Sequence, residues 1–213
     1  MRWGSRGWYA LLFAVMVLVT ADVLLDGPLR RLDWIIHEFC DAHVRDGTLA
    51  AVHTITKLGQ RGVLVAIIAP LSAAAAVRRR SLRYPAMSLA IVVLLSLLQS
   101  GLKAAVPRRF PAGGTDTLFT YGTAYPSGHT LNAFVLDWVI LELLVVALPE
   151  VRCRLPQRRR RDIALVTGTA AAVALTVADE HWLTDVLFSL ALGPVLLAGL
   201  IAAAPFNRGD VPR

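Results

Sequence analysis

The chain has 213 residues, of which 56% are hydrophobic, and it carries a formal net charge of +7 at pH 7. A soluble domain usually contains about 45–50% apolar residues, so this excess argues against a soluble protein and points to one embedded in a bilayer.

Six apolar segments are candidates for membrane-spanning helices, which need roughly 18 or more apolar residues. The first follows a basic start but has no small-x-small cleavage site, so we expect an uncleaved span and not a secretory signal. The sequence predicts an all-α polytopic membrane protein: a single domain over residues 1–213, built as a bundle of six transmembrane helices. The segments are 8–25, 63–77, 84–106, 129–148, 163–178 and 183–204.

Arginines gather on one side of these six segments. By the positive-inside rule that side is cytoplasmic, which places both termini in the cytoplasm of a plasma-membrane protein and the opposite loops outside. The net charge then reflects topology and contact with anionic lipids, and no nucleic-acid partner is expected. Cys40 and Cys153 fall on opposite sides of the membrane and cannot pair. The arginines are Arg2 and Arg6; Arg78, Arg79, Arg80 and Arg83; Arg152, Arg154 and Arg158 to Arg161; and Arg208 and Arg213.

The first outer loop, residues 26–61, is long and patterned. Apolar residues recur in it at helical spacing among acidic ones, which predicts a short amphipathic helix on the membrane surface; they are Leu32, Ile35, Ile36 and Phe39. The loop region also holds His37, His43 and His53. Their spacing fits no familiar ligand pattern, so we expect surface or interface residues, with no metal and no cofactor.

Two polar sequences each open an apolar run at the outer face. They are Pro-Ser-Gly-His at 126–129 and His-Trp-Leu-Thr-Asp at 181–185. The loop before the first, 107–126, is rich in Pro, Gly and Thr, and the turn before the second is very short. His129 and His181 therefore emerge at the same face from different helices. Three basic residues lie at that depth too: Lys103, Arg108 and Arg109.

These residue types suit phosphoryl chemistry. His181 and Asp185 are four apart at a helix start, which stacks them on one face, and a carboxylate that holds one imidazole nitrogen makes the other a better nucleophile. Ser127 and Gly128 open a helix whose free amides would suit a phosphate. The three basic residues would neutralise the remaining charge, and His129 would protonate the leaving oxygen.

Each element also has a purely structural interpretation. A histidine at a span boundary is often only an interfacial residue, and basic side chains there often snorkel to lipid headgroups. Asp137 and Glu142 lie inside the fourth span, where ionisable residues face the bundle interior. For these two we expect structural pairing. The matching depth of the outer residues favours a common site for them.

The motifs resemble those of the type 2 phosphatidic acid phosphatase superfamily, whose fold is a six-helix membrane bundle with an outward-facing site. Its second motif, Pro-Ser-Gly-His, is complete in residues 126–129. The His-x-x-x-Asp end of its third motif is complete in His181 and Asp185. The resemblance implies that His181 attacks phosphorus, that Asp185 orients it, and that His129 acts as the acid and base.

Two departures from the family pattern stand out. The first motif is a lysine, six residues, then Arg-Pro; after Lys103 this chain has Phe110-Pro111, with arginines at 108 and 109. The Ser-Arg pair that opens the third motif reads Ala174-Leu175. Related head-group transferases keep the His-His-Asp set without that pair, so the third motif is somewhat similar to theirs.

The sequence predicts a metal-independent lipid phosphate phosphatase that acts at the extracytoplasmic face through a phosphohistidine. Its expected substrate is a phosphatidate-like or polyprenyl-phosphate-like monoester or diphosphate. The outer loop at 115–125 is short and holds one acid, Asp116, which favours a small headgroup. Two alternatives remain: a head-group phosphotransferase that uses the same site, and a non-catalytic membrane protein with a degenerate site.

Overall fold

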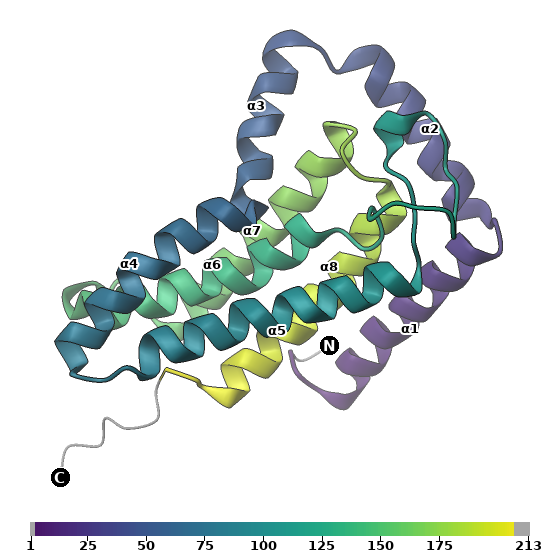
Figure 1. The fold of residues 1–213 in the computed structure, drawn as a ribbon. Helices are drawn as coiled ribbons and strands as arrows, with labels where there is room; N and C mark the ends of the chain where they lie inside the picture. The colour runs from purple at the N-terminus through teal and green to yellow at the C-terminus, as the bar shows by residue number, and fades with distance from the viewer. Residues whose placement is uncertain (1–2, 207–213) are drawn as a thin grey trace.

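A computed structural model describes residues 3–206, and its regular structure is helical, as expected (Figure 1). Within those residues the only β-type contact is an isolated bridge between Arg108 and Leu118. The α-helices are α1 (Arg6–Leu24), α2 (Pro28–His43), α3 (Asp46–Thr56), α4 (Arg61–Arg79), α5 (Arg83–Ala105), α6 (Gly128–Ala147), α7 (Gln157–Val177) and α8 (Leu183–Ala203), with short 3₁₀-helices η1 (Lys57–Gly59), η2 (Pro111–Gly113) and η3 (Pro149–Val151).

Five of these helices are long and apolar enough to cross a membrane: α1, α4, α5, α6 and α8. The segment expected as a further span, 163–178, lies almost entirely within α7. That helix begins with Gln157 and four arginines, Arg158 to Arg161, so its apolar part is shorter than in the other five. The structure thus supports an integral membrane protein with five candidate spans and a sixth long helix packed beside them.

The first outer loop folds as two helices and not as one. Figure 1 shows α2 and α3 as a bent arm that leaves the bundle at the end of α1 and returns to it at the start of α4. On α2, Ile35 and Phe39 are exposed while Asp33 is buried. An apolar face that points away from the protein suits a helix at the membrane surface. The buried carboxylate of Asp33 must instead find its partners inside the protein.

The centre of the bundle is α6, which packs against α4, α5, α7 and α8. A helix surrounded in this way is apolar on all sides, and most of the side chains of α6 are buried. Phe134 lies between two glycines: a Cβ on Gly168 would stand 2.6 Å from its ring, and one on Gly193 only 2.2 Å. Small residues on α7 and α8 thus allow both helices to approach α6 closely.

Of the two acids expected to pair inside the bundle, Glu142 does so. Its Oε1 accepts a hydrogen bond from Nε of Arg160 at 2.8 Å, which joins α6 to α7. Among the described residues, Oδ2 of Asp137 is buried without a hydrogen-bond partner. Cys40 is buried, Cys153 is exposed, and both are free thiols.

Candidate active site

The first turns of α6 and α8 are joined directly. The amide of Ser127 donates to the carbonyl of Asp185 at 3.2 Å, and the hydroxyl of Ser189 donates to the carbonyl of Ser127 at 3.1 Å. The Ser127 hydroxyl caps α6 by accepting from the amide of Thr130 at 3.4 Å. Ser127 is fully buried. These contacts bring His129 and His181 to the same end of the bundle from helices that are far apart in the sequence.

His181 and Asp185 meet as their spacing predicts. Nδ1 of His181 lies 3.3 Å from Oδ2 of Asp185, which also accepts the amide of Trp182 at 3.2 Å. Asp185 is wholly buried and His181 is 5% exposed, so solvent hardly competes for this contact. An imidazole held through Nδ1 presents Nε2 as its free nitrogen.

His129 is the second residue of α6 and is half-buried. Its imidazole interacts electrostatically with His181, Glu180, Lys103 and Arg61. Three segments therefore converge around one histidine of α6: the turn before α8, the end of α5 and the start of α4. His181, Glu180 and Lys103 lie in segments that the sequence predicted to meet at one face of the membrane, whereas Arg61 was not predicted to be there.

Lys103 reaches from the end of α5 to the loop that precedes α6. Its Nζ donates to the carbonyl of Thr123 and, at 3.1 Å, to that of Pro126. In the part of the chain that the structure describes, the amides of Gly128 and His129 have no hydrogen-bond partner. The first amides of a helix attract anions. Lys103 and these two amides therefore form a cationic corner beside Ser127.

Arg108 does something other than what the sequence suggested. It is completely buried, and all five N–H groups of its guanidinium are used by protein acceptors: two oxygens of Asp116, one of Thr184, one of Asp185 and one of Asp33. Burial alone would lower the pKa of Arg108, but these carboxylates raise it above its usual value. No donor is left for a phosphate, so this arginine holds Asp185 in place.

Arg109 lies at the rim. Its guanidinium stacks 4.7 Å from the ring centre of Tyr121, and among the described residues it has no hydrogen-bond or ion-pair partner. Its carbonyl accepts the indole N–H of Trp182 at 2.8 Å, which fixes the backbone beside His181. Of the two neighbouring arginines, Arg109 is the one with donors to spare.

The position where the family motif has its first arginine is Phe110. The Phe110 ring meets the His181 imidazole edge-on, with the ring centres 5.3 Å apart. The arginine position of the third motif is Leu175, which is fully buried. Its carbonyl accepts the amides of Glu180 and His181 at 3.0 and 3.3 Å. Neither position supplies a positive charge.

The arm formed by α2 and α3 is attached to the turn before His181. Nδ1 of His37 lies 2.8 Å from both oxygens of Asp179, and Nδ1 of His53 lies 2.8 Å from Oε1 of Glu180. Burial raises the pKa of Asp179, although His37 opposes the shift. Of the three histidines expected at the surface, only His43 stays free of an acidic partner, with its ring hydrogen-bonded to the carbonyl of Phe39.

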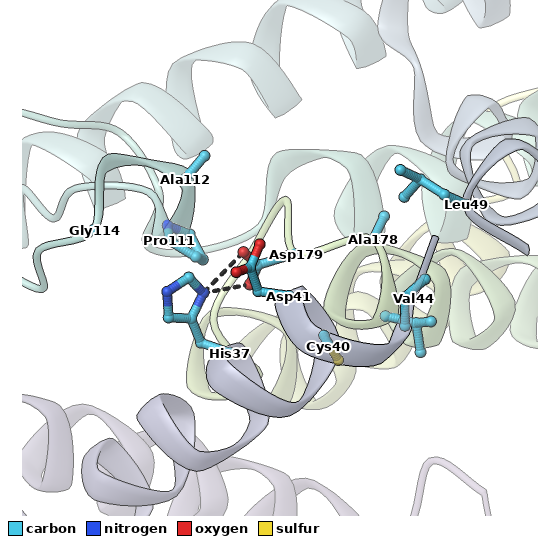
Figure 2. Close-up of a pocket in the computed structure, with 11 residues that line it drawn as sticks. His37, Cys40, Asp41, Val44, Leu49, Pro111, Ala112, Gly114, Ala178 and Asp179 are labelled. Atoms are coloured by element: carbon cyan, nitrogen blue, oxygen red, sulfur yellow. Dashed lines mark hydrogen bonds and ion pairs between the residues drawn. The ribbon is translucent and has the colours of Figure 1, made fainter. Parts of the chain in front are cut away.

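A cavity of about 460 Å³ opens beside this turn, between α2, α3 and η2. Figure 2 shows His37 and Asp179 joined across it, with Asp41 and Cys40 on the α2 side and Pro111 on the other. Within residues 3–206, no group of three His, Cys, Asp or Glu side chains could hold a metal ion. The cavity borders the candidate site through Pro111, the neighbour of Phe110.

The model of the PAP2 superfamily matches residues 81–209, a stretch that contains His129, His181 and Asp185. The chain belongs to the PAP2 superfamily. The resemblance of the motifs is thereby confirmed. The fold of this PAP2 chain is similar to the crystal structure of the first transmembrane PAP2-type phosphatidylglycerolphosphate phosphatase from Bacillus subtilis, with a TM-score of 0.73 and 22% sequence identity over 96% of this chain and 98% of that one. A search of curated proteins finds no match.

The superfamily and the membrane fold support a membrane phosphatase that acts on lipid phosphates. Of the predicted site residues in this PAP2 chain, the structure brings together His129, His181, Asp185, Lys103, Ser127 and Gly128. Arg108 stands behind them and Arg109 at their rim. Arg61, which acts on His129, was not among the predicted site residues. It carries one signal: an arginine at the end of α4 opposite to Arg78 and Arg79 runs against the charge asymmetry that the sequence predicted.

Proposed function

We propose that this PAP2 chain hydrolyses a lipid phosphate at the extracytoplasmic face of the plasma membrane through a phosphohistidine. The observation that carries the proposal is the carboxylate of Asp185, which contacts His181 through one oxygen and Arg108 through the other. A buried, hydrogen-bonded carboxylate of this kind fixes the tautomer of the imidazole and stabilises positive charge on it during attack. Such an arrangement suits a nucleophile.

In the first step, Nε2 of His181 attacks phosphorus, the bond from phosphorus to the lipid oxygen breaks, and His129 donates a proton to the departing alkoxide. In the second, water attacks phosphorus and gives a proton to His129. The N–P bond then breaks and releases inorganic phosphate. Lys103, Arg109 and the amides of Gly128 and His129 hold the phosphate oxygens. No step needs a metal or a cofactor.

A lipid substrate is supported by an apolar cleft below the site. It measures about 140 Å³ and runs between α5, α6 and α8. The neighbouring face of α5 is also apolar and open, with Leu94 and Leu97 well exposed. A hydrocarbon chain fits both surfaces. The cleft is lined by Ile91, Leu94, Leu95, Leu98, Val135, Leu196 and Leu200.

We also propose that residues 1–213 form one membrane domain with six spans and with both termini in the cytoplasm. The packing of α7 against both α6 and α8 supports α7 as the sixth span. Arg158 to Arg161 then mark its cytoplasmic end, while Asp179 and His181 lie outside.

A small headgroup is favoured by the second outer loop, which is the loop of residues 107–126 between α5 and α6. The side chain of its one acid between 115 and 125, Asp116, is buried and is bound by Arg108 and Arg30 at 2.7 Å. Hence Asp116 is not free to recognise a sugar hydroxyl. This supports a phosphate or diphosphate monoester of the phosphatidate or prenyl type as the substrate.

The second candidate is a head-group phosphotransferase, in which a lipid or sugar hydroxyl replaces water in the second step. The observation that favours it is the buried Ala174-Leu175 pair at the place of Ser-Arg. A degenerate, non-catalytic site is the third possibility, and the survival of His129, His181, Asp185 and Lys103 together argues against it.

The test uses the purified protein in detergent with EDTA and a panel of lipid phosphates carrying ³²P. The wild type should release inorganic phosphate. His181→Ala should lower turnover at least about 1,000-fold, whereas His43→Ala, a matched change at an exposed histidine, should not. Normal turnover in His181→Ala would rule out the mechanism. Label found on an added alcohol instead of free phosphate would establish the transferase, and strong preference for a glycosylated headgroup would contradict the small-headgroup assignment.

A further inference from the structure

The site lacks two of the positive charges that its motifs would normally carry. Phe110 and Leu175 stand at the two arginine positions, and the guanidinium of Arg108 is fully used by protein acceptors. A phosphate that passes through a pentacoordinate state carries about two negative charges, spread over oxygens that need donors in the transition state. Lys103 and Arg109 by themselves leave part of that charge uncompensated.

Arg61, the first residue of α4, lies near Lys103 and His129. The segment before it packs backbone to backbone on the first turn of α6, since a Cβ on Gly59 would stand 2.2 Å from the carbonyl oxygen of His129. The start of α4 is therefore held against the histidine that we propose as the acid. Its position is fixed by contact between main chains, which leaves little room for it to shift.

A buried amide network then directs the Arg61 side chain. Its Nη2 donates to Oε1 of Gln99, while Nε2 of Gln99 donates to Oδ1 of Asn132 at 2.9 Å and Nδ2 of Asn132 donates to the carbonyl of Gly59 at 3.1 Å. Gln99 is 2% exposed and Asn132 is 3% exposed. This ring of hydrogen bonds joins α4, α5 and α6 one turn below His129. Fully hydrogen-bonded buried networks are rigid, so this one fixes the position of the Arg61 guanidinium.

The amide network lies next to the cationic corner that Lys103 and the amides of Gly128 and His129 form. The oxygen of Gln99 that accepts from Arg61 is only 3.0 Å from where a Cβ on Gly128 would stand, and Cε of Lys103 is 3.9 Å from the same point. Lys103 and the Gln99 oxygen that binds Arg61 thus both lie next to Gly128. Glycine at 128 leaves space there, and its amide is one of the two without a partner.

The electrostatics of Arg61 point the same way. Its charge acts on both Lys103 and His129, and within residues 3–206 no carboxylate forms an ion pair with it. The printed hydrogen bond to Gln99 uses one of its five donors. The carboxylate of Asp185 acts on Lys103, but Arg61 has no ion-pair partner among residues 3–206, so this half-buried guanidinium next to a lysine can bind an anion. Guanidinium groups bind phosphate through two parallel hydrogen bonds.

We propose that Arg61 is a phosphate-binding residue of this site, which supplies from the start of α4 the positive charge that Phe110 and Leu175 do not. Gln99 and Asn132 act through Arg61 and are positioning residues. The inference rests on the proposed function only in taking a phosphate ester as the ligand. The structural alternative is an arginine that snorkels to lipid headgroups.

The experiment compares Arg61→Gln and Arg61→Lys with Arg45→Gln, a matched change at an exposed outer-face arginine whose side chain bonds only to backbone carbonyls nearby. Two quantities are measured for each purified protein: kcat/KM for phosphate release from a lipid phosphate, and the dissociation constant of orthovanadate. Arg61→Gln should lower kcat/KM about 100-fold and weaken vanadate binding, Arg61→Lys should lose less, and Arg45→Gln should match the wild type. Wild-type values for both quantities in Arg61→Gln would overturn the inference.

A rescue variant separates charge from folding. Phe110 is 38% exposed and touches His181, so an arginine can be placed there with little loss of packing. In Arg61→Gln/Phe110→Arg, the new guanidinium should restore part of kcat/KM and of vanadate affinity. Loss of activity that follows loss of thermal stability, with no rescue in the double variant, would overturn the inference in favour of a structural role.

The two readouts also distinguish this inference from the proposed function. If the wild type releases no phosphate from any lipid yet binds vanadate in a manner that depends on Arg61, the anion site stands and the hydrolase assignment fails. If the wild type hydrolyses lipid phosphates and Arg61→Gln does so equally well, the hydrolase assignment stands and Arg61 has no part in it.

Discussion

Arg108 and Asp185 form a buried ion pair, with Nη1 and Oδ1 2.9 Å apart and neither side chain exposed. The other oxygen of Asp185 lies 3.3 Å from Nδ1 of His181. Arg108 also binds Asp33 on α2 and Asp116 in the second outer loop, at 2.7 Å each. One guanidinium therefore links the proposed nucleophile to the arm and to the loop above it.

Replacing Arg108 should affect stability as well as activity. In Arg108→Gln the buried carboxylates of Asp33 and Asp185 lose the guanidinium that they bind, while Asp116 keeps Arg30. Breaking a buried pair in this way costs about 3–5 kcal/mol. We expect a clearly lower unfolding temperature in detergent and no measurable turnover. Arg109→Gln, the adjacent change at the rim, should keep the unfolding temperature and alter only substrate affinity. Equal stability of the two variants would contradict the assigned roles.

Asp185→Asn tests how His181 is oriented. The amide preserves the size of the side chain but removes the charge that stabilises the imidazolium and favours one tautomer. By comparison with buried carboxylate–histidine pairs in other enzymes, kcat should fall about 10²–10⁴-fold while KM changes little. Steady-state kinetics of phosphate release would measure this. A rise in KM at constant kcat would instead mean that Asp185 contributes to binding alone.

Two glycines on either side of Arg61 form a matched pair. In Gly59→Ala the new methyl group would meet the His129 carbonyl at 2.2 Å, so backbone has to move, and such overpacking costs about 1–3 kcal/mol. Gly62 has nothing within 4 Å of its Cβ position. In α4, Gly62→Ala should be neutral or stabilise by up to about 1 kcal/mol. We expect turnover to fall in Gly59→Ala only, with thermal unfolding as the second measurement; similar effects at both positions would contradict close packing at His129.

The stability of the second outer loop should depend on pH through Asp116. Burial favours the neutral acid, but the hydrogen bonds and charges of Arg108 and Arg30 lower the pKa of Asp116 below its ordinary value of 3.8. A carboxyl group with a depressed folded-state pKa stabilises the protein above its unfolded pKa, and this contribution is lost as pH falls through the folded value.

Asp116→Asn should therefore unfold at a lower temperature than the wild type at pH 7. The difference should shrink as the pH falls below about 3.8, where Asp116 of the unfolded chain begins to take up its proton, and should vanish below the lower pKa of the folded state. Unfolding temperatures of both proteins across a pH series would show it. A difference that stays constant down to the lowest pH would mean that shape, and not charge, is what Asp116 contributes.

Features that depend on residues close together in the sequence could be predicted from the sequence alone. The long apolar runs predicted the helices, and the spacing of four predicted that His181 and Asp185 would meet. The convergence of Lys103, His129 and His181 followed from topology, because ends of spans on one side of a membrane lie in one layer. The bounds of α7 were less accurate, since Arg158 to Arg161 extend the helix beyond its apolar part.

Partners across the fold could not be predicted in this way. Arg108 and Arg109 are equivalent in sequence, yet one is enclosed by Asp33, Asp116 and Asp185 and the other lies over Tyr121. The difference depends on α2 bringing Asp33 to a residue 75 positions later. Nothing in the local sequence around Asp33 or Arg108 indicates that these two residues meet.

The sequence alone was enough to propose His129, His181 and Asp185 as the residues that carry the chemistry, because a helix repeats every 3.6 residues and a bilayer sorts charge by side. Which cations can reach a phosphate was decided only by the tertiary structure. Three carboxylates and the Thr184 hydroxyl use every donor of Arg108. Hydrogen-bonded amides of α5 and α6 direct Arg61, which lies outside the motifs, to the corner beside Gly128. Hydrogen bonds act at about 3 Å, and only the folded chain brings these groups that close.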